Sequence, residues 1–182
     1  KGLSLLHFDG AKPVLLMMGG SSGAQTVNKA LRGALPRLTK TFDVAHICGR
    51  GNLDESLCGV PGYTQVEFLD KDLPDVLAAT DLVLSRAGSN ALCEFQALDK
   101  PMLLVPYPKG ASRGDQILNA QSYEKRGLCR VLLQENMTPD TLAQALEDTW
   151  RDREQLAAAV KAAPPADGTR RVLELIEEVQ KK

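Results

Sequence analysis

The sequence predicts an α/β fold, a doubly wound parallel sheet of about six strands with helices on both faces. Two observations predict it: short runs that are apolar at every position, and amphipathic stretches that alternate with these runs along all 182 residues. Fully apolar short runs are typical of strands buried on both faces of a parallel sheet. Regular alternation of strands and helices produces right-handed βαβ units, which assemble into such a sheet.

The expected strands are the six apolar runs at residues 14–18, 42–48, 65–69, 81–85, 102–105 and 130–133. The segments between them carry apolar residues three or four positions apart, which indicates helices through Val27–Leu35, Leu73–Ala79, Leu92–Leu98 and Ile117–Tyr123.

Towards the C-terminus, Thr138 and Pro139 are a plausible N-cap and first-turn proline of one long helix, which Pro164-Pro165 ends. A final helix is expected through Val172, Leu175, Ile176 and Val179. There is no internal repeat and no low-complexity linker, so residues 1–182 are expected to form a single domain.

The composition is that of an ordinary globular protein and argues against several classes of partner. Hydrophobic residues make up 43% of the chain, and the formal net charge is −1. Such a chain has no global field that attracts nucleic acid or anionic lipid, so we expect no nucleic-acid partner. No segment has the ~20 consecutive apolar residues of a membrane span, and no signal peptide is recognisable. The chain starts at Lys1 without an initiator methionine, which is typical of a part of a longer protein.

The cysteines and histidines do not form a recognisable metal or catalytic motif. The four cysteines are scattered without a CxxC pair and are interpreted as reduced cytosolic thiols: Cys48, Cys58, Cys93 and Cys129. His7 precedes the first strand and His46 lies inside an apolar strand, so we expect a core or surface role for each of them. No metal site and no catalytic base are therefore predicted in this chain.

A glycine-rich turn, Gly19-Gly20-Ser21-Ser22-Gly23-Ala24, follows the first strand and opens a helix. Glycines allow a close approach of the backbone, and a helix N-terminus offers free N–H groups to phosphate. The turn has no P-loop lysine and does not have the GxGxxG spacing. It either binds phosphate or only packs.

A second strand-to-helix turn spans Ser85–Glu94, with Gly88 at the bend followed by Ser89 and Asn90. In a doubly wound sheet the carboxyl ends of strands share one edge, so both turns can hold one diphosphate. Glu94 lies further along the expected helix, where a carboxylate can accept two hydrogen bonds from ribose hydroxyls. A solvated glutamate near a helix start is the alternative.

A long polar loop, residues 106–116, follows the fifth strand and leads into a helix that contains Asn119. Long loops in compact domains are often functional. Asp115, Gln116 and Asn119 are candidates for contacts with sugar hydroxyls, although Asp115 is also a good N-cap. Lys109 and Arg113 either face phosphate or keep the loop soluble.

In their order and spacing these segments resemble the C-terminal domain of the MurG family of glycosyltransferases. The resemblance is carried by GGSSGA at 19–24, EFLDKDLPDVLAATDLVLSRAGSNALCE at 67–94 and KPMLLVPYPKGASRGDQILNAQSYEKRG at 100–127. It implies the GT-B architecture, in which two Rossmann-like domains face each other across a cleft. The C-terminal domain then binds UDP-GlcNAc, and an N-terminal domain, absent here, binds the lipid-linked acceptor, contacts the membrane and holds the candidate base.

The resemblance also implies an inverting transfer of GlcNAc to lipid-linked MurNAc-pentapeptide, lipid I to lipid II, in peptidoglycan synthesis. The full-length protein would then be cytoplasmic and peripheral on the inner face of the bacterial membrane. The implied donor-binding positions are Gly19, Gly20, Ser21 and Gly23 at the phosphates, Phe68 and Leu69 at the uracil edge, Leu73 near base and ribose, Gly88, Ser89 and Asn90 at the diphosphate, Glu94 at the ribose, Asp115 and Gln116 at the GlcNAc hydroxyls, and Asn119 on the same helix.

Three features depart from the family pattern. Ala91 stands where a hydroxyl residue is common, Asp115 stands where some members have glutamine, and the loop at 109–114 is longer than in some members. No cofactor or metal is expected beside the donor, because preorganised N–H groups can stabilise the leaving UDP. The isolated chain is expected to bind a UDP-sugar without transferring it.

Two other functions stay open at this stage. One is a stand-alone catalytic subunit of another UDP-GlcNAc-dependent GT-B transferase, which the length of the native reading frame would decide. The other is a non-catalytic nucleotide-sugar-binding module, which turnover by the full-length protein would exclude.

Overall fold

The computed structural model describes residues 1–20, 24–110, 114–164, 173, 176–177 and 179. Within these residues the chain forms a six-stranded sheet in the order β3-β2-β1-β4-β5-β6. Every neighbouring pair of strands is parallel. The predicted α/β doubly wound sheet is therefore confirmed. The strands are β1 (Val14–Met18), β2 (Asp43–Ile47), β3 (Tyr63–Val66), β4 (Leu82–Ser85), β5 (Met102–Leu104) and β6 (Arg130–Val131).

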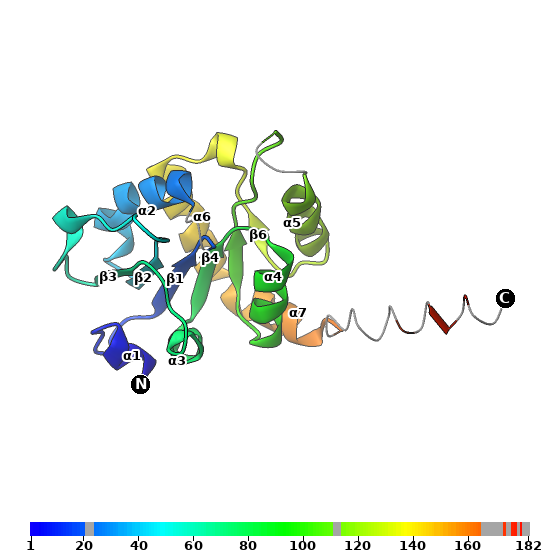
Figure 1. Cartoon of the computed structure of the whole chain (residues 1–182), viewed down its shortest axis with the longest axis horizontal. Coiled ribbons are helices and arrows are strands. Elements are labelled where there is room, and N and C mark those ends of the chain that lie inside the picture. Colours follow the sequence, from blue (N-terminus) through cyan, green and yellow to red (C-terminus); the bar gives the residue numbers. More distant parts are fainter. Residues whose placement is uncertain (21–23, 111–113, 165–172, 174–175, 178, 180–182) are drawn as a thin grey trace.

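Helices cover both faces of the sheet (Figure 1). The α-helices of the described residues are α1 (Gly2–Leu5), α2 (Gln25–Leu38), α3 (Leu73–Ala79), α4 (Ser89–Ala97), α5 (Asp115–Lys125), α6 (Pro139–Arg151) and α7 (Arg153–Ala162), and the short 3-10 helices are η1 (Glu55–Leu57) and η2 (Gln134–Asn136). No helix among the described residues is long and apolar enough to cross a membrane.

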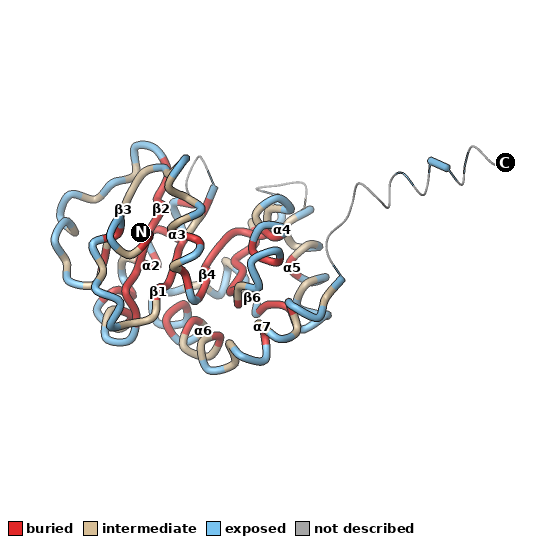
Figure 2. Tube along the Cα trace, turned by 90° about the horizontal axis from the view of Figure 1, so that it is seen from below, coloured by how far each residue is buried: buried red, intermediate tan, exposed pale blue. Residues whose placement is uncertain are grey.

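Two apolar layers enclose the sheet because successive strand residues point to opposite faces. On β1, Leu15 and Met17 pack in the layer that includes α2 and α6. Val14 and Leu16 pack in the layer that includes α3, α4 and α7. All four side chains are buried, and Figure 2 shows the buried strands between the two helical layers. This double burial explains why β1 is apolar at every position.

The third strand differs from its predicted range of 65–69. β3 spans Tyr63–Val66, and its pairing with β2 extends only as far as the Gly49 N–H, which donates to the Glu67 carbonyl over 3.1 Å. β3 is an edge strand, so the chain is free to leave the sheet there. Phe68 and Leu69 consequently lie in the loop after the strand, and Phe68 is 52% exposed.

The predicted long C-terminal helix is in fact two helices, α6 and α7, which meet at Asp152. The single-helix prediction is wrong because the two halves cover opposite faces: Leu146 of α6 packs with α2, whereas Val160 of α7 packs beneath α4. One straight helix cannot reach both layers. The predicted start is confirmed, since the Thr138 hydroxyl accepts a hydrogen bond from the Thr141 N–H at 3.1 Å. The expected final helix through Val172, Leu175, Ile176 and Val179 falls largely outside the described residues.

Candidate functional site

A pocket of about 210 Å³ opens at the carboxyl ends of the central strands. It lies where the chain order of the sheet reverses: from β1 the chain continues to β2 on one side, while β4 leads to β5 on the other. Such a switch point is where open α/β sheets bind ligands, because the loops after the two strands diverge there. The Ser85 hydroxyl donates to the Met18 carbonyl over 2.7 Å and joins the two strand ends.

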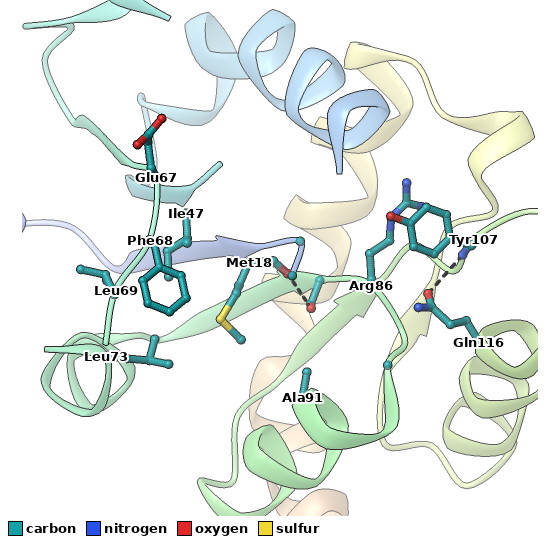
Figure 3. A pocket seen from close by; sticks show the side chains of 14 residues that line it. Met18, Ile47, Glu67, Phe68, Leu69, Leu73, Arg86, Ala91, Tyr107 and Gln116 are labelled. Atoms are coloured by element: carbon teal, nitrogen blue, oxygen red, sulfur yellow. Dashed lines mark hydrogen bonds between the residues drawn. The ribbon is translucent and has the colours of Figure 1, made fainter. Parts of the chain in front are cut away.

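The two ends of the pocket differ in chemistry (Figure 3). One end, at the ends of β2 and β3 and the start of α3, is mostly apolar and is lined by Ile47, Phe68, Leu69 and Leu73, with the acidic Glu67 beside them. The other end, beside β4 and β5, is polar and is lined by Arg86, Tyr107 and Gln116. Met18 and Ala91 lie between them. The pocket therefore suits a ligand with a flat apolar part at one end and polar or anionic groups at the other.

The first glycine turn is required by packing as well as by its position at the pocket. A Cβ on Gly19 would lie 2.7 Å from the Ala24 Cβ and 2.9 Å from its backbone nitrogen, so α2 starts directly against the end of β1. Gly20 has a φ of +88°, a conformation that favours glycine. Both residues also line the pocket. Ser21 and Gly23, the other predicted phosphate contacts in this turn, lie outside the described residues.

In the second turn, which leads into α4, no close protein contact requires a glycine. Gly88 is the N-cap, with φ −71° and ψ 136°, and a Cβ there would meet no atom within 4 Å. The first intrahelical bond runs from the Leu92 N–H to the Gly88 carbonyl, so the N–H groups of the first turn have no acceptor inside the helix. Ser89 and Asn90 are exposed there. The glycine leaves open space over a positively polarised helix end.

The predicted residues at the start of α5, after the loop that follows β5, make different contacts. Gln116 lines the pocket, and its Oε1 accepts a hydrogen bond from the Tyr107 N–H over 3.3 Å, while its amide N–H groups have no acceptor among the described residues. The Asn119 amide donates to the Ala87 carbonyl over 3.0 Å and so ties α5 to the loop after β4. Asp115 is exposed in the first turn of α5.

The N-cap of α5 is Gly114, in the left-handed conformation at φ +84°. The alternative that Asp115 is this N-cap is therefore wrong, because the chain enters the helix through a glycine turn. Asp115 is the first helical residue, where its negative charge interacts favourably with the helix dipole. Lys109 is exposed, and Arg113 lies outside the described residues.

Of the predicted site residues, the structure brings one group together around the pocket: Gly19, Gly20, Phe68, Leu69, Leu73, Gly88 and Gln116. Five other predicted residues do not line it, namely Ser89, Asn90, Glu94, Asp115 and Asn119. Glu94 is exposed on α4, three residues beyond the pocket-lining Ala91 and therefore on the same side of the helix. All the binding roles stay predictions.

Sequence reasoning missed Arg86 and Tyr107. The Arg86 side chain is 5% exposed, and its guanidinium carbon lies 4.0 Å from the centre of the Tyr107 ring. It donates to the Val105 carbonyl at 3.0 Å, the Pro106 carbonyl at 3.3 Å and the Gln134 Oε1 at 2.7 Å. Burial lowers the pKa of this guanidinium. The available signal was a charged residue directly after the predicted fourth strand.

Of the core and surface roles expected for His46, the structure shows the core role. Its ring nitrogens lie 2.8 Å from the Tyr63 hydroxyl and 3.0 Å from the Asn28 Oδ1, and burial followed by the Arg32 charge lowers its pKa to about 3. His7 is exposed. Among the described residues, no group of three or more His, Cys, Asp or Glu side chains is arranged to hold a metal ion. All four cysteines are free thiols.

Comparison with known proteins identifies similar chains along nearly the whole length. The family described as glycosyltransferase family 28 C-terminal domain matches residues 14–178. The UDP-N-acetylglucosamine–N-acetylmuramyl-(pentapeptide) pyrophosphoryl-undecaprenol N-acetylglucosamine transferase of Geobacillus thermodenitrificans is 48% identical over 97% of this chain and 50% of its own length. A transferase 2 of the same name from Bacillus cereus is 46% identical over 98% of this chain and 51% of its own. The chain thus spans about half the length of these curated relatives.

Solved structures share the fold. The crystal structure of MurG from Acinetobacter baumannii superposes with a TM-score of 0.77 at 24% identity, over 92% of this chain and 50% of that one. The spinosyn forosaminyltransferase SpnP gives a TM-score of 0.65 at 18% identity, over 95% of this chain and 46% of that one. In both cases this fold occupies about half of a larger glycosyltransferase.

Proposed function

This chain belongs to the glycosyltransferase family 28 C-terminal domain family, and we propose that residues 1–182 are the donor-binding domain of a MurG-type N-acetylglucosaminyltransferase. Its ligand is UDP-GlcNAc, the donor that the names of its relatives contain. One observation carries the proposal: a pocket at the switch point between β1 and β4 has an apolar end, a polar end and an open glycine-capped helix terminus between them.

The chemistry of the pocket supports one orientation of the donor. The uracil lies at the apolar end, against Phe68, Leu69 and Leu73. The diphosphate lies over the first turn of α4 at Gly88, Ser89 and Asn90, where free N–H groups and the helix dipole favour an anion.

The rest of the donor follows from the same orientation. The ribose lies beside α4, within reach of Glu94, and Gly19 and Gly20 allow the phosphates to approach the end of β1. The GlcNAc extends towards Gln116 and Asp115, where the Gln116 amide N–H groups, which have no acceptor within the described part of the chain, donate to sugar oxygens.

The proposed reaction of the complete protein is an inverting displacement. A hydroxyl of the lipid-linked MurNAc-pentapeptide attacks the anomeric carbon of GlcNAc, the bond from that carbon to the β-phosphate oxygen breaks, and UDP leaves with the electron pair. The α4 N–H groups stabilise the negative charge that grows on UDP, without having to reorganise. The proton of the attacking hydroxyl passes to a base on the other half of the protein.

The other half of the protein therefore supplies the acceptor site, and we assign to it the contact with the inner face of the bacterial cell membrane. This assignment agrees with the lengths of the relatives, of which this chain covers about half. The chain alone is then a binding domain, without transfer activity.

Calorimetric titration of the chain with UDP, UDP-GlcNAc and ADP tests the proposal. We expect UDP and UDP-GlcNAc to bind, and ADP to bind at least tenfold more weakly, because a purine is larger than the base for which the apolar end is proposed. Equal affinities for UDP and ADP would disprove the uracil assignment. Absence of binding by every nucleotide would disprove the donor site.

A further inference from the structure

Arg86 is a buried cation without an anionic partner among the described residues. The ion pairs among the described residues involve other cations, namely Lys1, Arg37, Arg130, Arg151 and Arg153. The acceptors of Arg86 are two backbone carbonyls and the amide oxygen of Gln134, all of them neutral. Its Nε is buried and has no hydrogen-bond acceptor among the described residues.

Such an arrangement is costly for a purely structural residue. Buried charges are normally paired with an opposite charge, since transfer of an ion out of water is unfavourable and neutral dipoles offset only part of that cost. A neutral side chain that donates hydrogen bonds would tie the same loop to Gln134 without this cost. The positive charge itself therefore requires an explanation.

The position of Arg86 supplies that explanation. It is the first residue after β4 and lines the pocket together with Gly88, the cap of α4, and Tyr107, whose ring covers the guanidinium. At low effective dielectric, a fixed charge acts on a nearby ligand more strongly than it would in water. We propose that Arg86 provides the counter-charge for the diphosphate of the bound nucleotide, so that it selects for the phosphates of the ligand and not for its base.

This inference rests on the proposed donor site, and it has a structural competitor. In the competing explanation, Arg86 only anchors the loop at Val105 and Pro106, and loss of Arg86 would disturb the whole pocket. The two explanations differ in what happens to a ligand without phosphate. Loss of a counter-charge lowers the affinity only for phosphorylated ligands, whereas a disturbed loop lowers the affinity for uridine as well.

The test measures affinities of the 182-residue chain for uridine, UDP and ADP by calorimetry. The variants are Arg86→Gln, which keeps hydrogen-bond donors but loses the charge, and Arg86→Lys, which keeps the charge. Arg126→Gln is the matched control, because Arg126 also stacks on a tyrosine, Tyr123 at 4.5 Å, but does not line the pocket.

We expect Arg86→Gln to lower the affinities for UDP and ADP by the same factor, about tenfold or more, because one charge-assisted interaction is lost. Uridine affinity should stay within about twofold, Arg86→Lys should keep most of the preference for UDP over uridine, and Arg126→Gln should resemble the unmodified chain.

An equal loss of affinity for uridine and for UDP in Arg86→Gln would disprove the proposal that Arg86 is the counter-charge. Loss of the UDP preference in a folded Arg86→Lys would overturn it too, and this variant decides the matter if Arg86→Gln does not fold. Equal affinity of the unmodified chain for UDP and ADP would instead count against the uracil assignment and leave the counter-charge standing.

Discussion

Replacement of Gly88 by alanine should separate ligand binding from stability. The added Cβ would meet no protein atom within 4 Å, and the backbone at φ −71° and ψ 136° is allowed for alanine. The methyl group therefore enters open space over the first turn of α4. In the proposed complex that space holds the diphosphate.

Two effects on stability oppose each other in Gly88→Ala. Alanine is a poorer N-cap than glycine, at a cost of roughly 0.5–1 kcal/mol. It also restricts the unfolded chain, which stabilises the fold by about 0.4–1 kcal/mol. The net change should be close to zero. Loss of one hydrogen bond to a charged ligand costs about 1.5–3 kcal/mol, which corresponds to a roughly 10- to 150-fold weaker affinity for UDP.

The assay pairs calorimetric titration of UDP with thermal unfolding, and Gly19→Ala is the contrasting variant. At Gly19 the new Cβ would lie 2.7 Å from the Ala24 Cβ and 2.9 Å from its backbone nitrogen. Such overpacking costs about 1–3 kcal/mol. At roughly 2–4 °C per kcal/mol for a chain of this size, Gly19→Ala should melt about 2–12 °C lower, whereas Gly88→Ala should melt within about 2 °C of the unmodified chain.

Unchanged UDP affinity in a stable Gly88→Ala would refute the argument that the ligand approaches this backbone. A large fall in its melting temperature would refute the argument that the space above Gly88 is free of protein atoms.

Three further predictions concern other parts of the chain. Glu94→Gln should lower the affinity for UDP-GlcNAc about tenfold, through loss of a hydrogen bond to a charged group, and should leave the stability unchanged because Glu94 is exposed. Calorimetry measures the affinity, and Glu124→Gln, at an exposed position of α5, is the control. Equal affinities of the two variants would contradict a ribose contact. Burial lowers the pKa of His46 from 6.5 to about 3, so between these values the unfolded state binds a proton that the native state excludes, and the free energy of unfolding should fall as the pH drops from 6.5 towards 3. Urea denaturation at pH 7 and pH 5 should show this fall reduced in His46→Gln but retained in His7→Gln, and an undiminished fall in His46→Gln would argue against the buried neutral histidine. Thr138→Ala removes the N-cap of α6 and should lower the free energy of unfolding by about 1 kcal/mol, measured by urea denaturation, with unchanged UDP affinity. A loss of UDP affinity would mean that α6 is coupled to the pocket.

The local signals in the sequence were enough for the elements that are buried on both faces. The range predicted for the first strand is the observed Val14–Met18, because this central parallel strand is covered on both faces and all of its side chains are apolar. The capped start of α6 was also predictable, since Thr138 and Pro139 act within one helical turn. The same holds for the glycine turn at Gly19 and Gly20, where conformation and close packing are local requirements.

Other features depended on contacts between residues far apart in the chain. Phe68 and Leu69 are apolar but leave the sheet because β3 is an edge strand, and strand order is not a local property. The break at Asp152 arises because α6 and α7 pack on opposite faces.

The environment of Arg86 depended on distant residues in the same way, since its partners Val105 and Gln134 are 19 and 48 positions away along the chain. Sequence alone therefore determined most of the strands, helices and glycine bends, because those choices depend mainly on neighbours a few positions apart. Only the tertiary structure decided which bends share one pocket and which buried charge lies beside it, because burial and pairing arise when distant segments meet.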